Sequence, residues 1–189
     1  MFKNEKDYDI FISFKSKDKD GKSTEDALIA RDLYDQFVAE GYEVFMSDVS
    51  LKDRINAEYE PIIYNALQTS EVFILVGTSK ENVYSPWVRN EWSRFINIIN
   101  TSGGRLNPSF FIPVYKNMSP YEMPRINNRN VQCVDASDLL YKKNISDYIK
   151  HLISPTYSHE KDLTKEELAR IKIQEEAKIK AEERAQIRK

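Results

Sequence analysis

Short apolar runs alternate with amphipathic stretches from Tyr8 to about Ile153, and this alternation most constrains the fold. The apolar runs are short and rich in β-branched and aromatic residues, which is typical of buried strands. The stretches between them carry apolar residues at helical spacing. Strands that alternate with helices predict an α/β domain whose five-stranded parallel sheet is flanked by helices, in the flavodoxin-like doubly wound arrangement.

The predicted strands cover Tyr8–Phe14, Glu43–Met46, Glu71–Val76, Phe110–Tyr115 and Val131–Val134. Ser23 or Thr24 can cap the first helix, and Gly41 follows its last turn, where a positive φ is favoured. Ser85 and Pro86 open another helix as its cap and its first residue. A polar loop is expected over 47–54, and a final helix from about 139 to 153.

The chain divides into two unequal parts, a domain at 7–153 and a charged tail at 154–189. Seventeen of the last 30 residues are charged. This composition predicts a solvated helix or linker. A coupling helix that leads into a further domain beyond Lys189 is the alternative.

Composition excludes several classes of function. The formal net charge of −2 argues against a general binder of nucleic acid or anionic membrane. The longest apolar run is too short to span a bilayer, and the N-terminus lacks the apolar region of a secretory signal, so we expect a cytoplasmic protein. A single cysteine, Cys133, excludes an intramolecular disulfide and a Cys-rich zinc site, and we expect no metal. With His151 and His159 as the only histidines, carboxylates must carry any catalysis.

No glycine-rich phosphate loop is present, and the third strand ends in Val76-Gly77-Thr78, without the aspartate of a phosphoacceptor. What remains is a group of carboxylates near strand ends and in the segments that follow them. They are Asp48, Asp53, Glu58, Glu60, Glu81 and Glu91.

Glu91 is the most informative of these carboxylates. Trp87 and Glu91 stand at i and i+4 on the helix that begins at Pro86, so they are neighbours on one face. Glu91 also borders the apolar stripe of this helix, which predicts a half-buried carboxylate beside an indole. The alternative is a surface glutamate near a helix N-terminus that pairs with Arg89 or Arg94.

Three sequence blocks in order carry a resemblance to a known family. They are Tyr8–Phe14 (YDIFISF), Gly41–Phe45 (GYEVF) and Ser85–Trp92 (SPWVRNEW). The first resembles the opening Y-D-V-F-I-S-[FY] strand of Toll/interleukin-receptor (TIR) domains, and the last resembles their S-x-W-[CV]-x-x-E signature. The match covers residues 7 to about 153. The composition of the chain resembles that of the bacterial branch of the family.

The resemblance implies one of two functions. Many members are NAD+ glycohydrolases or cyclases, which release nicotinamide and ADP-ribose or a cyclic ADP-ribose isomer, here in bacterial antiphage immune signalling. Other members are non-catalytic interaction modules. Self-association through TIR domains is implied in either case, with NAD+ as substrate and no cofactor. A nucleoside deoxyribosyltransferase-like enzyme, which uses related carboxylate chemistry on a similar fold, is a minor rival.

The resemblance also implies roles for individual residues. Glu91 matches the catalytic glutamate, and Trp87 matches an aromatic residue of the pocket. The other substrate-binding positions are Ser13, Phe14 and Lys15 at the end of the first strand, and Asp48 and Leu51 in the loop after the second. Two roles stay open for Leu51: docking on a neighbouring copy, or packing against its own domain.

Overall fold

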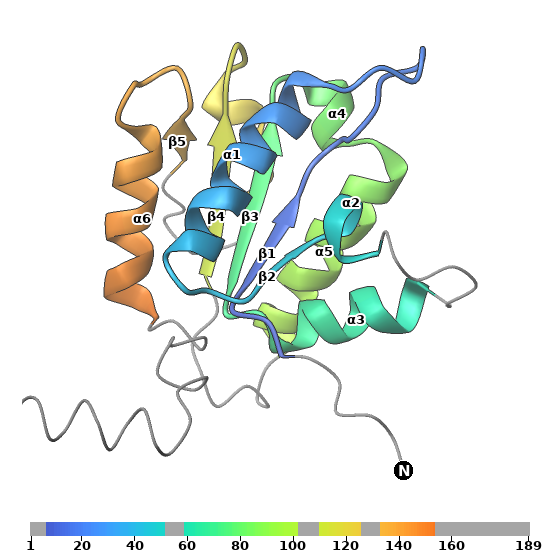
Figure 1. The fold of residues 1–189 in the computed structure, drawn as a ribbon. Helices are drawn as coiled ribbons and strands as arrows, with labels where there is room; N and C mark the ends of the chain where they lie inside the picture. The colour runs from blue at the N-terminus through green and yellow to red at the C-terminus, as the bar shows by residue number, and fades with distance from the viewer. Residues whose placement is uncertain (1–6, 52–58, 102–109, 126–132, 154–189) are drawn as a thin grey trace, which may run out of the picture. The chain divides into compact units, whose positions relative to one another are not determined.

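The computed structural model describes residues 7–51, 59–101, 110–125 and 133–153 (Figure 1). The chain divides into two compact units, Met1–Thr156 and Tyr157–Lys189, and every described residue belongs to the first. The predicted tail lies outside the described residues, as do Asp53 and Glu58. Within the described ranges no helix has the length and apolar character needed to cross a membrane.

Five parallel strands form one sheet in the order β2-β1-β3-β4-β5. The strands are β1 (Ile10–Ser13), β2 (Val44–Met46), β3 (Val72–Gly77), β4 (Phe110–Tyr115) and β5 (Val134–Asp135). Ile12 pairs with Met46 on one side and Ile74 on the other, which fixes the register of β2, β1 and β3. This order confirms the predicted flavodoxin-like, doubly wound sheet.

Helices cover both faces of the sheet (Figure 1). They are α1 (Glu25–Ala39), α2 (Ser47–Ser50), α3 (Tyr59–Thr69), α4 (Lys80–Val83), α5 (Pro86–Thr101) and α6 (Tyr141–Leu152), with a 3₁₀ turn, η1 (Pro120–Glu122). Buried residues of α1 and α6 pack in one hydrophobic cluster, and those of α3 and α5 pack in a second. The sheet therefore separates two cores.

Strand β1 contributes side chains to both cores. Successive side chains of a strand point to opposite faces. Ile10 and Ile12 accordingly join the α1 cluster, whereas Phe11 joins the α3–α5 cluster and stacks on Phe45 and Phe73, with ring centroids 4.8 and 5.1 Å apart. The same alternation turns Ser13, the last residue of β1, toward the α5 side.

Several predicted helix boundaries are confirmed, and others differ. Thr24 caps α1 by accepting the Ala27 N–H at 3.2 Å, and Gly41 has a φ of 90° after the helix ends. Helix α5 begins at Pro86, as predicted. Ser85 was expected to cap this helix, but its hydroxyl donates to the Asn82 carbonyl of the preceding turn. That contact ties α5 to the preceding turn.

Two short helices were not predicted. The polar segment expected as a loop over 47–54 begins with one helical turn, α2. Helix α4 follows β3 directly and is capped by Ser79, which accepts the Asn82 N–H. The turn comes so close to the strand that a Cβ on Gly77 would lie 2.2 Å from Val83 Cγ2, so this position requires glycine.

Candidate functional site

The carboxyl ends of β1 and β3 meet where the strand order reverses direction. In open α/β sheets ligands bind in the crevice outside this switch point. Ser13 is the last residue of β1, and Thr78 directly follows β3. Helix α5, which carries Trp87 and Glu91, packs against both strands. Three of the predicted site residues, Ser13, Trp87 and Glu91, thus lie with Thr78 at one end of the sheet.

Glu91 is buried at this edge, with 4% of its surface exposed. Its Oε2 atom accepts a hydrogen bond of 2.6 Å from the Ser13 hydroxyl, across 78 residues of sequence. Its Oε1 atom has no hydrogen-bond partner within the described part of the chain. A buried carboxylate oxygen without a partner is uncommon and needs a physical explanation.

The surroundings of Glu91 disfavour its charge. Burial raises the pKa of this carboxyl from 4.5 to about 7, because the ionised form loses its hydration. The Ser13 hydroxyl, the Trp87 side chain and the Arg94 charge oppose this increase only in part. Near pH 7 the group therefore exists in both protonation states.

The burial and the partners of Glu91 differ from both predictions made from the sequence. Glu91 is almost fully buried where half-burial was predicted, because the end of β1 packs directly on it. The alternative surface pair with Arg94 is not formed. Arg94 instead binds Glu60 of α3, with 2.5 Å between the guanidinium and carboxylate atoms.

The two tryptophans of α5 have different surroundings. Trp87 is 49% exposed and lines a shallow hollow of about 450 Å³. Trp92 is half-buried against the α3–α5 cluster, and its indole N–H donates to the Val83 carbonyl at 3.0 Å. This agrees with the apolar stripe in the sequence, which includes Trp92 and leaves Trp87 beside Glu91.

The other predicted site residues lie in several places. Phe14 is buried in the α1 cluster, so its side chain is on the face of the sheet opposite Glu91. Lys15 is partly exposed just after β1, and Asp48 is partly exposed in α2. Leu51 is half-buried and packs against the α3–α5 cluster of its own domain. Their roles in substrate binding stay predictions.

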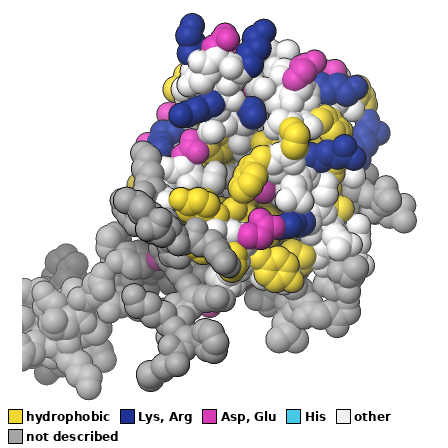
Figure 2. Space-filling model, turned by 90° about the vertical axis from the view of Figure 1, so that its right-hand side faces the viewer, with side chains coloured by type: hydrophobic (Ala, Val, Ile, Leu, Met, Phe, Trp, Pro, Cys, Tyr) yellow, Lys and Arg dark blue, Asp and Glu magenta, His cyan; other side chains and the backbone are white. Residues whose placement is uncertain are grey.

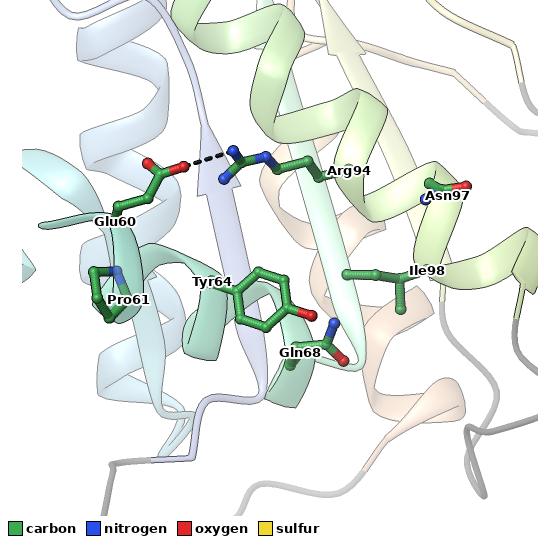
Figure 3. Close-up of a pocket in the computed structure, with 7 residues that line it drawn as sticks. All are labelled: Glu60, Pro61, Tyr64, Gln68, Arg94, Asn97 and Ile98. Carbon is green, nitrogen blue, oxygen red and sulfur yellow. Dashed lines mark ion pairs between the residues drawn. The ribbon is translucent and has the colours of Figure 1, made fainter.

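A groove of about 530 Å³ runs between α3 and α5 (Figure 3). It is lined by Glu60, Pro61, Tyr64, Gln68, Arg94, Asn97 and Ile98. Figure 2 views the side of the molecule that carries these helices and shows hydrophobic side chains gathered around an adjacent acidic and basic pair. Glu91 does not line this groove, which is therefore separate from the switch-point site.

Sequence reasoning missed a second buried carboxylate, Asp26, in the first turn of α1. Its Oδ1 atom accepts hydrogen bonds from the N–H and the hydroxyl of Thr78, at 2.9 and 2.5 Å. An acidic residue in a first helical turn is common, so the local sequence carries no signal for this contact. Among the described residues no group of His, Cys, Asp and Glu side chains could hold a metal ion.

A TIR domain family model matches residues 10–153 of the chain. Among solved structures, the chain is similar to a metazoan TIR-STING receptor from C. gigas in complex with 2′,3′-cGAMP, with a TM-score of 0.51 and 18% identity over 82% of this chain. It spans 42% of that receptor chain. It is also similar to the TIR domains of the activated Roq1 resistosome, which directly recognizes the pathogen effector XopQ. That match has a TM-score of 0.50 and 17% identity over 77% of this chain and 99% of the other.

These two structural likenesses, at under 25% identity, establish a shared fold. No curated protein matches the sequence. Evidence on the chemistry of this chain therefore comes from its own residues.

Proposed function

The chain belongs to the TIR domain family, and from this premise we propose that it is an NAD+ nucleosidase. It would cleave the bond between nicotinamide and ribose and release nicotinamide together with ADP-ribose or a cyclic ADP-ribose isomer. The single observation that carries the proposal is the buried Glu91 carboxylate at the switch point, with one oxygen held by Ser13 and the other unpaired.

The chemistry of NAD+ suits a single carboxylate. The ribose C1′ is bonded to a pyridinium nitrogen, which takes the bonding electron pair and leaves as neutral nicotinamide without a general acid. The sugar becomes oxocarbenium-like, and a nearby carboxylate stabilises its positive charge. Water or a hydroxyl or ring nitrogen of the substrate then attacks C1′, and the choice between them sets a linear or cyclic product.

The environment of Glu91 strengthens this interaction. In a site shielded from water, the attraction between the carboxylate and the developing cation is larger than in solution. The unpaired Oε1 atom is free to face the ribose, while the Ser13 hydroxyl fixes Oε2. Trp87, half-exposed beside Glu91, offers a surface for the flat nicotinamide ring.

The proposal also requires movement. Glu91 is 4% exposed, so NAD+ reaches its Oε1 atom only after the groups that cover it are displaced. We propose that self-association of TIR domains stabilises the open form, in a role in bacterial antiphage immune signalling in the cytoplasm. A non-catalytic interaction module is the second candidate, and the near-complete burial of Glu91 is the observation that favours it.

The experiment is a direct assay of nicotinamide release. The purified chain is incubated with NAD+ at several protein concentrations, and the products are separated by liquid chromatography. Glu91→Gln should release no nicotinamide above background. Glu81→Gln makes the same chemical change at an exposed position of α4 and should match the wild type.

Each outcome of this assay decides between the candidates. Nicotinamide release that depends on Glu91 supports the nucleosidase, and the second product identifies linear or cyclic chemistry. A folded wild type that leaves NAD+ intact at every concentration supports the interaction module.

A further inference from the structure

Two buried side-chain atoms in the described ranges lack a hydrogen-bond partner, Glu91 Oε1 and Asp26 Oδ2. Buried polar groups nearly always have partners, so each exception needs a physical reason. The proposed chemistry gives one for Glu91, whose free oxygen would face the ribose. It makes no use of Asp26, which is fully buried in the first turn of α1.

Asp26 connects segments that are distant in sequence. Its Oδ1 atom accepts both the N–H and the hydroxyl of Thr78, 52 residues away. Its Oδ2 atom has no partner in the described residues, and the neighbouring Thr24, which caps α1, donates its hydroxyl to the Lys15 carbonyl. Asp26 thus joins α1 to the residue after β3, and the cap of the same helix joins it to the segment after β1.

These segments are the ones that place Glu91. Lys15 is two residues beyond Ser13, whose hydroxyl donates to Glu91. Helix α4 is joined to α5 through the hydrogen bond from the Trp92 indole to the Val83 carbonyl, and Trp92 directly follows Glu91 in the chain. Thr78 directly follows β3, in which Leu75 pairs with Ser13 of β1, and it directly precedes the cap of α4, so Asp26 is connected through Thr78 to both partners of the Ser13–Glu91 hydrogen bond.

We infer that Asp26 is a positioning residue for the Glu91 site: by holding Thr78 to α1, it fixes the carboxyl end of β3 beside β1 and keeps the Ser13 hydroxyl within hydrogen-bond distance of Glu91. The catalytic consequence rests on the proposed function. The geometric consequence does not, because the protonation of Glu91 reports on its hydrogen bond to Ser13 with no substrate present.

The sign of the effect separates positioning from simple electrostatics. If Asp26 acted on Glu91 through its charge, removing that negative charge would lower the pKa of Glu91. If it positions Ser13, its removal weakens a hydrogen bond to the ionised carboxylate and raises the pKa above about 7.

The other charged groups near these two carboxylates stay in place. Near Glu91 these include Arg94, which is paired with Glu60, and Glu25 adjoins Asp26 in the chain and is paired with Lys116 at 2.6 Å. None of them changes in the variants below.

The test is a titration of the Glu91 carboxyl carbon by NMR in the wild type and four variants. Ser13→Ala removes the hydrogen bond directly and should raise the midpoint by roughly one pH unit. Asp26→Ala should raise it in the same direction, and the two changes combined should raise it no further than Ser13→Ala alone. Thr78→Val removes one of the two hydrogen bonds to Asp26 and should give a smaller rise.

Two comparisons make the test specific. Asp26→Asn keeps an acceptor oxygen for Thr78 and should restore a midpoint close to that of the wild type. Asp32→Ala removes a carboxylate from the exposed face of the same helix, where Asp32 lies 3.5 Å from Lys142, and should change nothing. If Asp26→Ala fails to fold, Thr78→Val carries the test.

The inference is overturned if folded Asp26→Ala and Thr78→Val leave the Glu91 midpoint unchanged or lower it. For an active enzyme, the acid limb of the pH profile for nicotinamide release should move upward with the NMR midpoint. A wild type that leaves NAD+ intact defeats the proposed function alone, because the titration tests the positioning role without substrate.

Discussion

Among the described residues, each face of the sheet carries one buried carboxylate at the carboxyl edge of the strands, and the two have different surroundings. On the α1 side, Asp26 receives two hydrogen bonds from Thr78. On the α5 side, Glu91 receives one from Ser13, and the neighbouring Trp87 is half-exposed. Burial alone therefore does not mark a reactive group. Each carboxylate has one oxygen held by hydrogen bonds and one without a partner in the described residues, so what separates them is access: Asp26 is fully buried, whereas Glu91 lies beside a half-exposed tryptophan.

The largest expected effect is the loss of NAD+ cleavage in Glu91→Gln. The amide has nearly the same shape but no negative charge to stabilise the oxocarbenium-like transition state. Loss of such a group should lower the rate of nicotinamide release by about 10²-fold or more. Circular dichroism should show an unchanged fold. Activity retained by the folded variant would mean that Glu91 takes no part in the reaction. Glu91 would then be a structural carboxylate, as Asp26 is.

The same substitution should increase stability at high pH. The raised pKa of Glu91 means that the folded state binds its proton more tightly than the unfolded chain does. This contribution to folding is fully present below pH 4.5 and is lost as the pH rises through about 7. The pKa interval from 4.5 to about 7 corresponds, at about 1.4 kcal/mol per pH unit, to a change in the free energy of unfolding on the order of 3 kcal/mol.

Urea unfolding of the wild type and Glu91→Gln at pH 5 and pH 8 measures this difference. The variant should be the more stable of the two at pH 8, and the advantage should shrink at pH 5. Since the other carboxylates are common to both proteins, their titration cancels. Equal pH dependence in the two proteins would mean that Glu91 ionises without a burial penalty.

The two tryptophans of α5 should differ in whether they contribute to stability or to the site on the Glu91 side. Trp92→Ala removes packing against the α3–α5 cluster and the hydrogen bond to Val83, and should cost about 3 kcal/mol of stability. Trp87→Ala should cost less than about 1 kcal/mol, because half of that side chain is already exposed. It should instead reduce NAD+ cleavage. A more destabilised Trp87 variant that still cleaves NAD+ would reverse the two roles.

The fold follows from apolar runs and capping residues that are recognisable in short stretches of the sequence. Phe110–Tyr115 is apolar throughout and forms β4 over those same residues. Thr24 and Gly41 bound α1 as their capping chemistry predicts. The position of Glu91 next to Trp87 and the apolar stripe likewise pointed to a carboxylate at the border of the core.

The contacts that define the site could not be predicted because they join residues far apart in sequence. Ser13 and Glu91 are separated by 78 positions, and Asp26 and Thr78 by 52. Neither partner carries a local signal of the other. The depth of Glu91 depends on the end of β1 packing over α5, and helical periodicity specifies only the face of α5 on which Glu91 lies.

The smallest expected effect concerns assembly. The side of the molecule that carries Glu91 exposes large apolar residues, including Tyr64 at 54% and Trp87 at 49%. Burying such surface between two copies favours association, and a dimer that also stabilises the open site would make turnover per molecule rise with protein concentration. NAD+ turnover measured over about a hundredfold range of concentration tests this. A flat profile would mean that the site is complete within one chain.

Leu51 provides the matched variant for this measurement. Because its side chain packs against the cluster of its own domain, Leu51→Asp should lower the melting temperature, through a loss of about 1–2 kcal/mol. The concentration dependence of turnover should persist in the variant, since the surface that carries Tyr64 and Trp87 is unchanged. If Leu51→Asp instead keeps the wild-type melting temperature and abolishes the concentration dependence, Leu51 is the residue that docks on a neighbouring copy. A second chain would then contact the Glu91 side of the sheet through Leu51.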